Sequence, residues 1–225
     1  MYDVNVIYTG HNDSGNCDID GLYKIIEGIR PDVIFEELGG TQFNEAYKEQ
    51  KLYSVETRTI TKYLQNYVIV HIPVDTYETP EYSEEKNEFI EKFMYDNDSE
   101  YKRILSIQKK CAGAYGYEFL NSYQFIDYTE KRKAQEETMC QNTDNEEYKK
   151  NYKDYIKWNN NREYEMIKNI YKYSKENKFS KAIFLIGADH SCTINKKIQD
   201  YQEEETKLNW IFNIKDLSHL KYPQS

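Results

Sequence analysis

The sequence predicts an α/β fold: a mostly parallel sheet with flanking helices and a large helical insertion between the third and fourth strands. Three observations support it. β-rich runs alternate with helical patterns over the first 75 residues, strand signals then stop, and they resume near residue 182. Alternation at this spacing is typical of a parallel sheet with right-handed crossovers. We expect one α/β domain over residues 1–225, with the insertion at about 81–177.

The strands are located by short apolar, β-rich runs that end at turn residues. The second run is followed by Glu36 and Glu37, and the third by Pro73-Val74-Asp75. The expected strands are Val4–Tyr8, Val33–Phe35, Val68–Ile72, Ala182–Ile186 and Leu208–Ile214.

Helical patterns fill the intervals between these strands. The first helix has Asp18 or Asp20 as its cap, because a carboxylate accepts hydrogen bonds from the first turn. A second, long helix is expected from Gly39-Gly40-Thr41 to about Gln65, and a short one from about Thr193 to Gln202. The apolar face of the first helix consists of Leu22, Ile25, Ile26 and Ile29.

The insertion, from about Glu81 to Asn177, shows only helical segments rich in Glu, Lys and Tyr. Two stretches break these helices: Gly113-Ala114-Tyr115-Gly116 and the polar run from Gln141 to Asn145. The last segment predicts a long helix from about Asn145 to Asn177.

Composition narrows the class of protein. Lys and Arg number 30 against 39 Asp and Glu, which gives a net charge of −9 and argues against a nucleic-acid or membrane partner. No run approaches the roughly 18 apolar residues of a membrane span. The start does not read as a signal peptide, and the four cysteines are scattered, so we expect a cytoplasmic protein with reduced thiols.

Chemistry-bearing residues follow the carboxyl ends of the expected strands, where ligands bind in open parallel sheets. His11 follows the first strand, Glu36 and Glu37 the second, and Asp75 the third. Asp189 and His190 follow the fourth. Adjacent glutamates point to opposite sides of a strand, so we expect one of the two to face the site, with Glu36 slightly favoured.

The long helix of the insertion carries a second signal. Its apolar stripe is interrupted by Asn159 and Arg162, where core residues would be expected. A buried guanidinium needs a carboxylate or an anionic ligand, and Glu36, Glu37 or the substrate could supply it. Glu163 could reach the same cleft, and would face inward in place of Arg162 if the stripe were displaced by one residue.

These features together resemble the TraB/PrgY, Tiki-protease, ChaN-like and erythromycin-esterase-like superfamily. The resemblance rests on the strand that ends at His11, on "PDVIFEEL" with Glu36 and Glu37, on "NREYEMIKNI" from Asn161, and on "IFLIGADH", which contains Gly187-x-x-His190. Tyr8 stands where the superfamily usually has a first Gly-x-x-His glycine. The resemblance implies a site at His11, Glu36 or Glu37, Arg162 and His190. Members include metal-dependent proteases, hydrolases that use His and Glu alone, and haem-binding proteins.

The leading interpretation is a peptidase- or esterase-like hydrolase that acts on a small molecule or peptide. In a metal form, His11, Glu36 and His190 would bind Zn²⁺, Mn²⁺ or Co²⁺, with Glu37 or Asp75 as general base. Arg162 would hold an anionic group or the developing oxyanion, and Asp75, Asn159 and Glu163 would contact substrate. In a metal-free form, a histidine oriented by a glutamate would be the base.

Two alternatives do not involve catalysis. One is a protein that binds haem or another planar ligand through histidine or tyrosine, and the other is a regulatory module that binds a peptide. The sequence contains no Walker A loop, no GxGxxG after a strand, no GxSxG and no HExxH, so nucleotide binding and serine hydrolysis have no motif in their favour.

Overall fold

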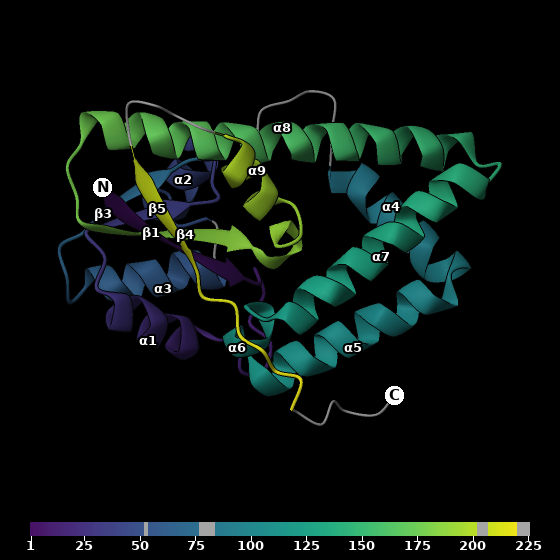
Figure 1. The fold of residues 1–225 in the computed structure, drawn as a ribbon, viewed down its shortest axis with the longest axis horizontal. Helices are drawn as coiled ribbons and strands as arrows, with labels where there is room; N and C mark the ends of the chain where they lie inside the picture. The colour runs from purple at the N-terminus through teal and green to yellow at the C-terminus, as the bar shows by residue number, and fades with distance from the viewer. Residues whose placement is uncertain (52–53, 77–83, 202–206, 220–225) are drawn as a thin grey trace.

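In a computed structural model, which describes residues 1–51, 54–76, 84–201 and 207–219, the chain folds around a parallel sheet of five strands. The order across the sheet is β3-β2-β4-β1-β5, and every pairing is parallel. The predicted α/β class is therefore confirmed, as is the long helical stretch between β3 and β4 (Figure 1). The strands are β1 (Tyr2–Thr9), β2 (Val33–Glu36), β3 (Val70–Pro73), β4 (Lys181–Gly187) and β5 (Leu208–Phe212).

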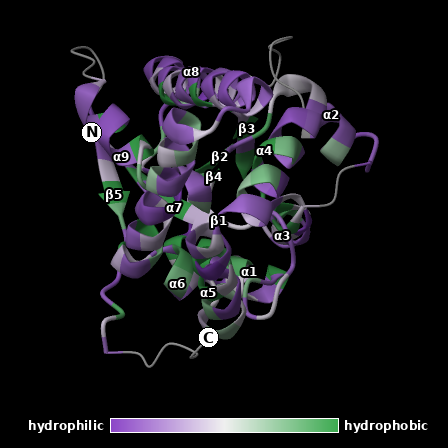
Figure 2. Cartoon of the chain, turned by 90° about the vertical axis from the view of Figure 1, so that its right-hand side faces the viewer, coloured by the Kyte–Doolittle hydropathy of each residue, from purple (hydrophilic) through white to green (hydrophobic). Residues whose placement is uncertain are grey.

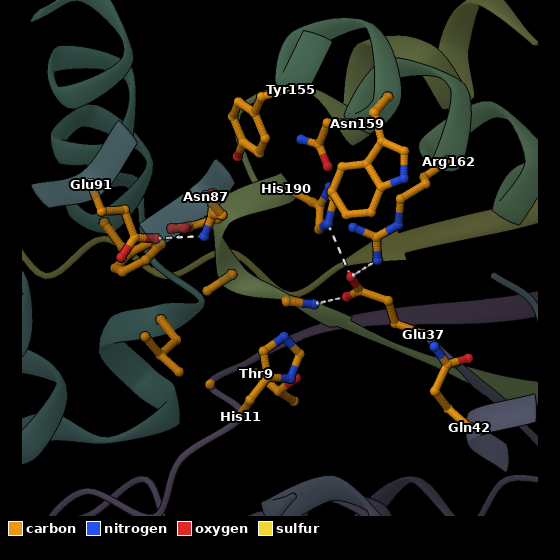
Figure 3. Close-up of a pocket in the computed structure, with 17 residues that line it drawn as sticks. Thr9, His11, Glu37, Gln42, Asn87, Glu91, Tyr155, Asn159, Arg162 and His190 are labelled. Carbon is orange, nitrogen blue, oxygen red and sulfur yellow. Dashed lines mark hydrogen bonds and ion pairs between the residues drawn. The ribbon is translucent and has the colours of Figure 1, made fainter. Parts of the chain in front are cut away.

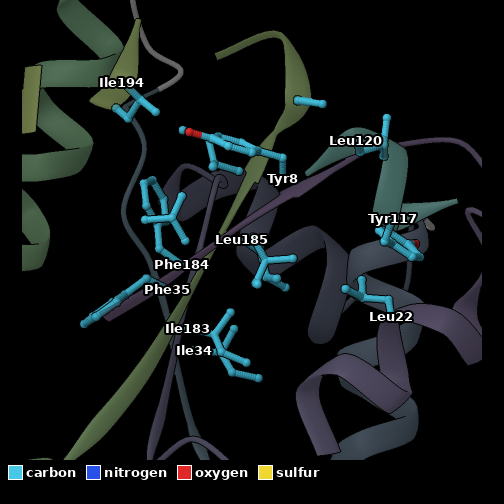
Figure 4. Packing of buried hydrophobic residues seen from close by; sticks show 14 of the residues in the cluster. Tyr8, Leu22, Ile34, Phe35, Tyr117, Leu120, Ile183, Phe184, Leu185 and Ile194 are labelled. Atoms are coloured by element: carbon cyan, nitrogen blue, oxygen red, sulfur yellow. The ribbon is translucent and has the colours of Figure 1, made fainter. Parts of the chain in front are cut away.

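Helices cover both faces of the sheet, which explains why the central strands β2, β4 and β1 are largely buried. In Figure 1, α1 (Ile19–Ile29) and α3 (Val55–Leu64) lie below the strands, and α8 (Glu146–Glu176) and α9 (Ile194–Asp200) lie above them. Figure 4 shows the resulting alternation: Ile34 and Ile183 point toward one face, and Phe35 and Phe184 toward the other.

The expected first helix is confirmed. The Asp18 carboxylate accepts a hydrogen bond from the Gly21 N–H at 2.7 Å, which makes Asp18 the cap. Leu22 and Ile26 are fully buried against the sheet. The helix ends where Arg30 adopts a left-handed conformation, directly before Pro31.

The single helix expected from Gly39 to Gln65 is wrong. The chain forms α2 (Gly40–Tyr47), leaves helical geometry, and begins α3 only at Val55. Gln50 has a φ of 54°, which an α-helix does not allow, and Ser54 caps α3 through the Thr57 N–H. Residues 52–53 of the expected helix lie outside the described residues.

The insertion is a set of helices: α4 (Glu84–Asn97), α5 (Ser99–Tyr115), α6 (Tyr117–Leu120), α7 (Tyr123–Asn142) and the long α8. The predicted breaks at Gly116 and near Gln141–Asn145 separate these helices as expected. Residues 81–83, where the insertion was expected to begin, and Gln202, the expected end of α9, lie outside the described residues.

The insertion has its own apolar cluster away from the sheet. Ile90, Met94, Tyr101, Tyr148 and Tyr152 form it, and α4, α5 and α8 contribute its members. In Figure 2, hydrophobic residues gather on the strands at the centre, and hydrophilic residues cover much of the outer helical surface. None of the described helices is long and apolar enough to cross a membrane.

Two glycines allow the loop after β1 to pack against the end of α5. Gly15 and Gly116 both have a positive φ. A Cβ at Gly15 would lie 2.4 Å from the Gly113 carbonyl oxygen, and one at Gly116 would lie 2.5 Å from that of Asn16. This close contact places the insertion beside the strand that carries His11.

Candidate functional site

A cavity of about 700 Å³ lies where the carboxyl ends of β1, β2 and β4 meet the insertion. Sheet-end residues supply one side, including His11, Glu37 and His190 (Figure 3). Helices α4 and α8 supply the opposite side, including Glu91 and Trp158. Its volume falls within the range of small-molecule sites, about 300–1,000 Å³.

Strand alternation decides which of the two adjacent glutamates reaches this cavity. Glu36 is the last residue of β2 and shares a face with Ile34. Glu37 points to the other face, toward α8, and lines the cavity. The structure therefore brings Glu37, rather than Glu36, together with Arg162 and His190.

Glu37 is a buried carboxylate with three donors. Its Oε1 accepts from Arg162 Nη2 at 2.7 Å and lies 3.1 Å from His190 Nε2, and its Oε2 accepts from the Gly187 N–H at 2.6 Å. Burial alone would raise the pKa of Glu37, but the charges of His190 and Arg162 outweigh burial and hold it well below its usual value. Glu37 is therefore a permanent negative charge.

Arg162 is buried, as the interrupted stripe on its helix predicted. It donates to Asp75 through Nε at 2.9 Å and through Nη2 at 2.5 Å, so Glu37 and Asp75 bind it from two sides. The Trp158 ring centroid lies 4.3 Å from the guanidinium carbon. Burial raises the pKa of Asp75 although Arg162 opposes it. Arg162 is thus held by protein carboxylates.

His190 lies between two glutamates. Its Nδ1 is 2.5 Å from Glu163 Oε1 and its Nε2 is 3.1 Å from Glu37 Oε1. Burial would lower the pKa of His190, but the two carboxylates outweigh burial and raise it to about 9. His190 is therefore charged at neutral pH and both of its N–H groups are bound.

Glu163 faces inward beside Arg162 and not in place of it, since both side chains are buried. It is fully buried and binds Lys197 Nζ and the Thr193 hydroxyl. Burial would raise the pKa of Glu163, but His190 and Lys197 lower it to about 2. Three carboxylates (Glu37, Asp75, Glu163) thus balance three cations (Arg162, His190, Lys197) in one buried network.

His11 stands apart from this network and is exposed at the cavity. Its side chain is 56% exposed, and its Nδ1 lies 3.2 Å from Glu56 Oε1. The contact with the Glu56 carboxylate raises the pKa of His11 to about 9. Helix α3 fixes this pair, because the Val55 N–H donates to the His11 carbonyl at 3.2 Å and Glu56 follows directly.

The second ring nitrogen of His11 points toward the cavity wall at Gly187. A Cβ at Gly187 would lie 3.2 Å from His11 Nε2 and 3.2 Å from Glu37 Oε2. Such contacts are tighter than most side chains tolerate, so glycine at this position leaves room for both groups. The Gly-x-x-His pattern at Gly187 therefore has a steric reason.

Glu36 belongs to a separate cluster on the other face of β2. It accepts from Tyr47 Oη at 2.5 Å and lies 2.7 Å from His71 Nδ1. Burial raises the pKa of Glu36 although His71 and Tyr47 oppose it. A small cavity of about 30 Å³ separates Glu36 from Glu56 and His11.

The metal site expected at His11, Glu36 and His190 finds no matching donor set. Glu36 binds Tyr47 and His71, and both nitrogens of His190 lie beside carboxylates. Across residues 1–51, 54–76, 84–201 and 207–219, no group of three or more His, Cys, Asp or Glu is placed to hold a metal ion. These residues do not fit a bound metal, so no chemical step is assigned to one.

Several important residues were missed from the sequence. Glu56 lies in "SVETRTI" on a pattern that reads as a polar helix face, and Lys197 in "INKKIQD" reads as a solvated lysine. Trp158 falls one position outside the stripe. Of these three residues, only Trp158 could have been found from the sequence, because it directly precedes the predicted site residue Asn159 on the same helical turn. The predicted Asn159 does line the cavity.

Comparison with protein-family models, with curated proteins and with solved structures gives no match for this chain. The resemblance to the TraB/PrgY, Tiki-protease, ChaN-like and erythromycin-esterase-like superfamily therefore stays a prediction, and the function has to be argued from the site.

Proposed function

We propose that the protein is a hydrolase that cleaves an ester or peptide bond in the cavity, with His11 as general base. One observation carries the proposal. Glu56, a buried carboxylate, holds one ring nitrogen of an exposed histidine, while the other nitrogen points toward the cavity wall. This is the arrangement of an oriented base, in which the carboxylate fixes the ring and stabilises the imidazolium that forms.

The chemistry needs only water and the neutral form of His11. Nε2 takes a proton from a water molecule as the water oxygen bonds to the carbonyl carbon, and the carbonyl π electrons move onto oxygen. When the tetrahedral intermediate collapses, the leaving group departs with the proton held on Nε2. Glu56 stabilises the charged imidazolium between these steps.

Glu37, Arg162 and His190 act on this base indirectly. The charge of Glu37 contributes to the raised pKa of His11, and Arg162 and His190 hold the Glu37 carboxylate in place. His190 is a positioning residue, because both of its nitrogens already face carboxylates. The reactive histidine of the proposal is therefore His11 alone.

A screen of purified protein tests the proposal. Chromogenic esters and peptides are assayed with chelator, and again with added Zn²⁺, Mn²⁺ or Co²⁺, beside His11→Ala and the matched control His219→Ala. We expect hydrolysis with chelator present that His11→Ala loses and His219→Ala keeps. Hydrolysis that needs metal would support the metal form. A Soret band with haemin that requires His11, without hydrolysis, would support the haem-binding alternative.

A further inference from the structure

We infer that the cavity binds an uncharged, hydroxyl-rich ring of the size of a monosaccharide, on the wall supplied by the helical insertion. The inference rests on the proposed function in one respect only, which is that it places the substrate beside His11. It replaces the sequence-based expectation of an anionic group held by Arg162.

The charges of the wall argue against an anionic ligand. Arg162 is bound by Asp75 and Glu37, His190 by Glu37 and Glu163, and His11 by Glu56. An incoming carboxylate or phosphate would have to displace one of these carboxylates, most of which are buried in the network. It would also lie near Glu91 and Asp189, which line the same cavity. These charges therefore argue against an anionic ligand.

Aromatic rings offer a flat apolar contact on the insertion side. Trp158 and Tyr155 lie one helical turn apart on α8, with ring centroids 6.5 Å apart, and both line the cavity. The contact between Trp158 and Arg162 fixes the indole in the wall. The apolar C–H face of a sugar ring packs well against such a surface.

Two side-chain amides that line the cavity are available to hydrogen-bond a ligand. Asn159 is 9% exposed and lines the cavity, yet its amide has no hydrogen-bond partner among the described residues. The Gln42 side chain, on the opposite side in Figure 3, is half-buried and also lines the cavity, and its amide likewise has no hydrogen-bond partner among the described residues. The Asn159 amide atoms are not among the buried polar atoms without a partner, and they face the cavity, where they are available to a ligand. An amide both donates and accepts, which suits a hydroxyl group.

The size of the cavity agrees with this class. About 700 Å³ accommodates a sugar ring against Trp158 and leaves space for an attached group that reaches His11. The surface that binds the substrate and the general base would then belong to different parts of the fold: the insertion would bind the ring, and the end of the sheet would supply His11.

Tryptophan fluorescence tests the inference directly. The chain has two tryptophans, and Trp210 lies on β5, so Trp210→Phe leaves Trp158 as the only indole. This variant is titrated at pH 6 with methyl glucoside, methyl galactoside, methyl mannoside and N-acetylglucosamine, and with charged glucuronate and glucosamine. We expect a saturable change with at least one neutral sugar, and binding at least tenfold weaker for glucuronate, the anionic counterpart.

Three further variants in the same Trp210→Phe background test which side chains contact the sugar. Asn159→Ala should weaken sugar binding at least tenfold without lowering the melting temperature, since its amide makes no hydrogen bond within the described structure. Asn161→Ala, an exposed asparagine on the same helix, should change neither. His11→Ala should still bind sugar, so loss of hydrolysis there would leave this inference intact. No saturable change with any neutral sugar, or tighter binding of a charged one, would overturn it.

Discussion

The side-chain amide of Asn121 is hydrogen-bonded to both backbone polar groups of Tyr8. Its Oδ1 accepts from the Tyr8 N–H at 2.9 Å, and its Nδ2 donates to the Tyr8 carbonyl at 2.9 Å. Asn121 lies between α6 and α7 in the insertion, and Tyr8 is near the end of β1, three residues before His11. A single side chain thus continues the pairing of β1 and attaches the insertion to the strand that positions the proposed base.

Replacing Asn121 should therefore destabilise the protein. Asn121→Ala leaves the Tyr8 N–H and carbonyl buried without partners, at a cost of about 1–3 kcal/mol for each. Urea unfolding followed by circular dichroism measures the loss. Asn121→Asp keeps an acceptor for the N–H but turns a buried carboxylate oxygen toward the Tyr8 carbonyl, so it should also be destabilised. Equal stability of Asn121→Ala and the parent would contradict this account of the contact.

The buried network should depend on Arg162 more than on any one of its carboxylates. Arg162→Leu leaves Asp75 buried without its cation and Glu37 paired with His190 alone, and breaking a buried pair in this way costs about 3–5 kcal/mol. Asp75→Asn combined with Arg162→Leu removes the stranded charge and should recover part of the loss. The same unfolding assay compares the variants. A double variant no more stable than Arg162→Leu would contradict the account that Asp75 and Arg162 stabilise each other.

The pH dependence of stability follows from His190 and Glu163. The pKa of His190 is raised from 6.5 to about 9 on folding, so its contribution is complete below pH 6.5 and is lost as pH rises through about 9. The pKa of Glu163 is lowered from 4.5 to about 2, so its contribution is complete above pH 4.5 and is lost as pH falls toward 2. The contributions of His190 and Glu163 are therefore both complete between about pH 4.5 and 6.5.

Unfolding measured from pH 4 to 10 checks this expectation, with His190→Asn as the comparison. The variant should be less stable overall and should lose less stability between pH 6.5 and 9, because the contribution of His190 to that fall is then absent. An identical alkaline slope in parent and variant would show that His190 does not titrate as described.

Gly187 should matter for activity more than for folding. An Ala Cβ would meet His11 Nε2 and Glu37 Oε2 at 3.2 Å, so one of them must move by a few tenths of an ångström. Misplacing a catalytic group can cost up to about 100-fold in rate. Gly28→Ala is the matched control: no atom lies within 4 Å of its Cβ, and in helix α1 alanine should add about 0.5–1 kcal/mol of stability. Full activity of Gly187→Ala would argue against this packing.

The sheet could be predicted from the sequence, but the partners of the buried charged side chains could not. Strand runs at β1, β2 and β4 and the absence of strand signals in the insertion reflect strong periodic patterns, which survive without tertiary information. The break between α2 and α3 was missed because Lys48–Lys51 is polar without Pro or Gly, and Gln50 adopts its positive φ against its own preference.

Side-chain partners depend on details that periodicity does not carry. The choice between Glu36 and Glu37 followed from where β2 ends, since a shift of one residue exchanges the two faces. Glu56 and Lys197 came into the site through α3 and α9, which the tertiary fold places beside His11 and Glu163. Nothing in their local sequence distinguishes them from solvated charges.

The most direct test of the central claim is the pH–rate profile of ester hydrolysis for the parent and for Glu56→Gln. If His11 is the base, the rate should rise with pH to a midpoint of about 9, because the neutral form then accumulates. Removing the Glu56 charge should move this midpoint down toward the ordinary histidine value of 6.5 and lower the limiting rate. A midpoint unchanged in Glu56→Gln would contradict the proposal that Glu56 and His11 form the catalytic pair.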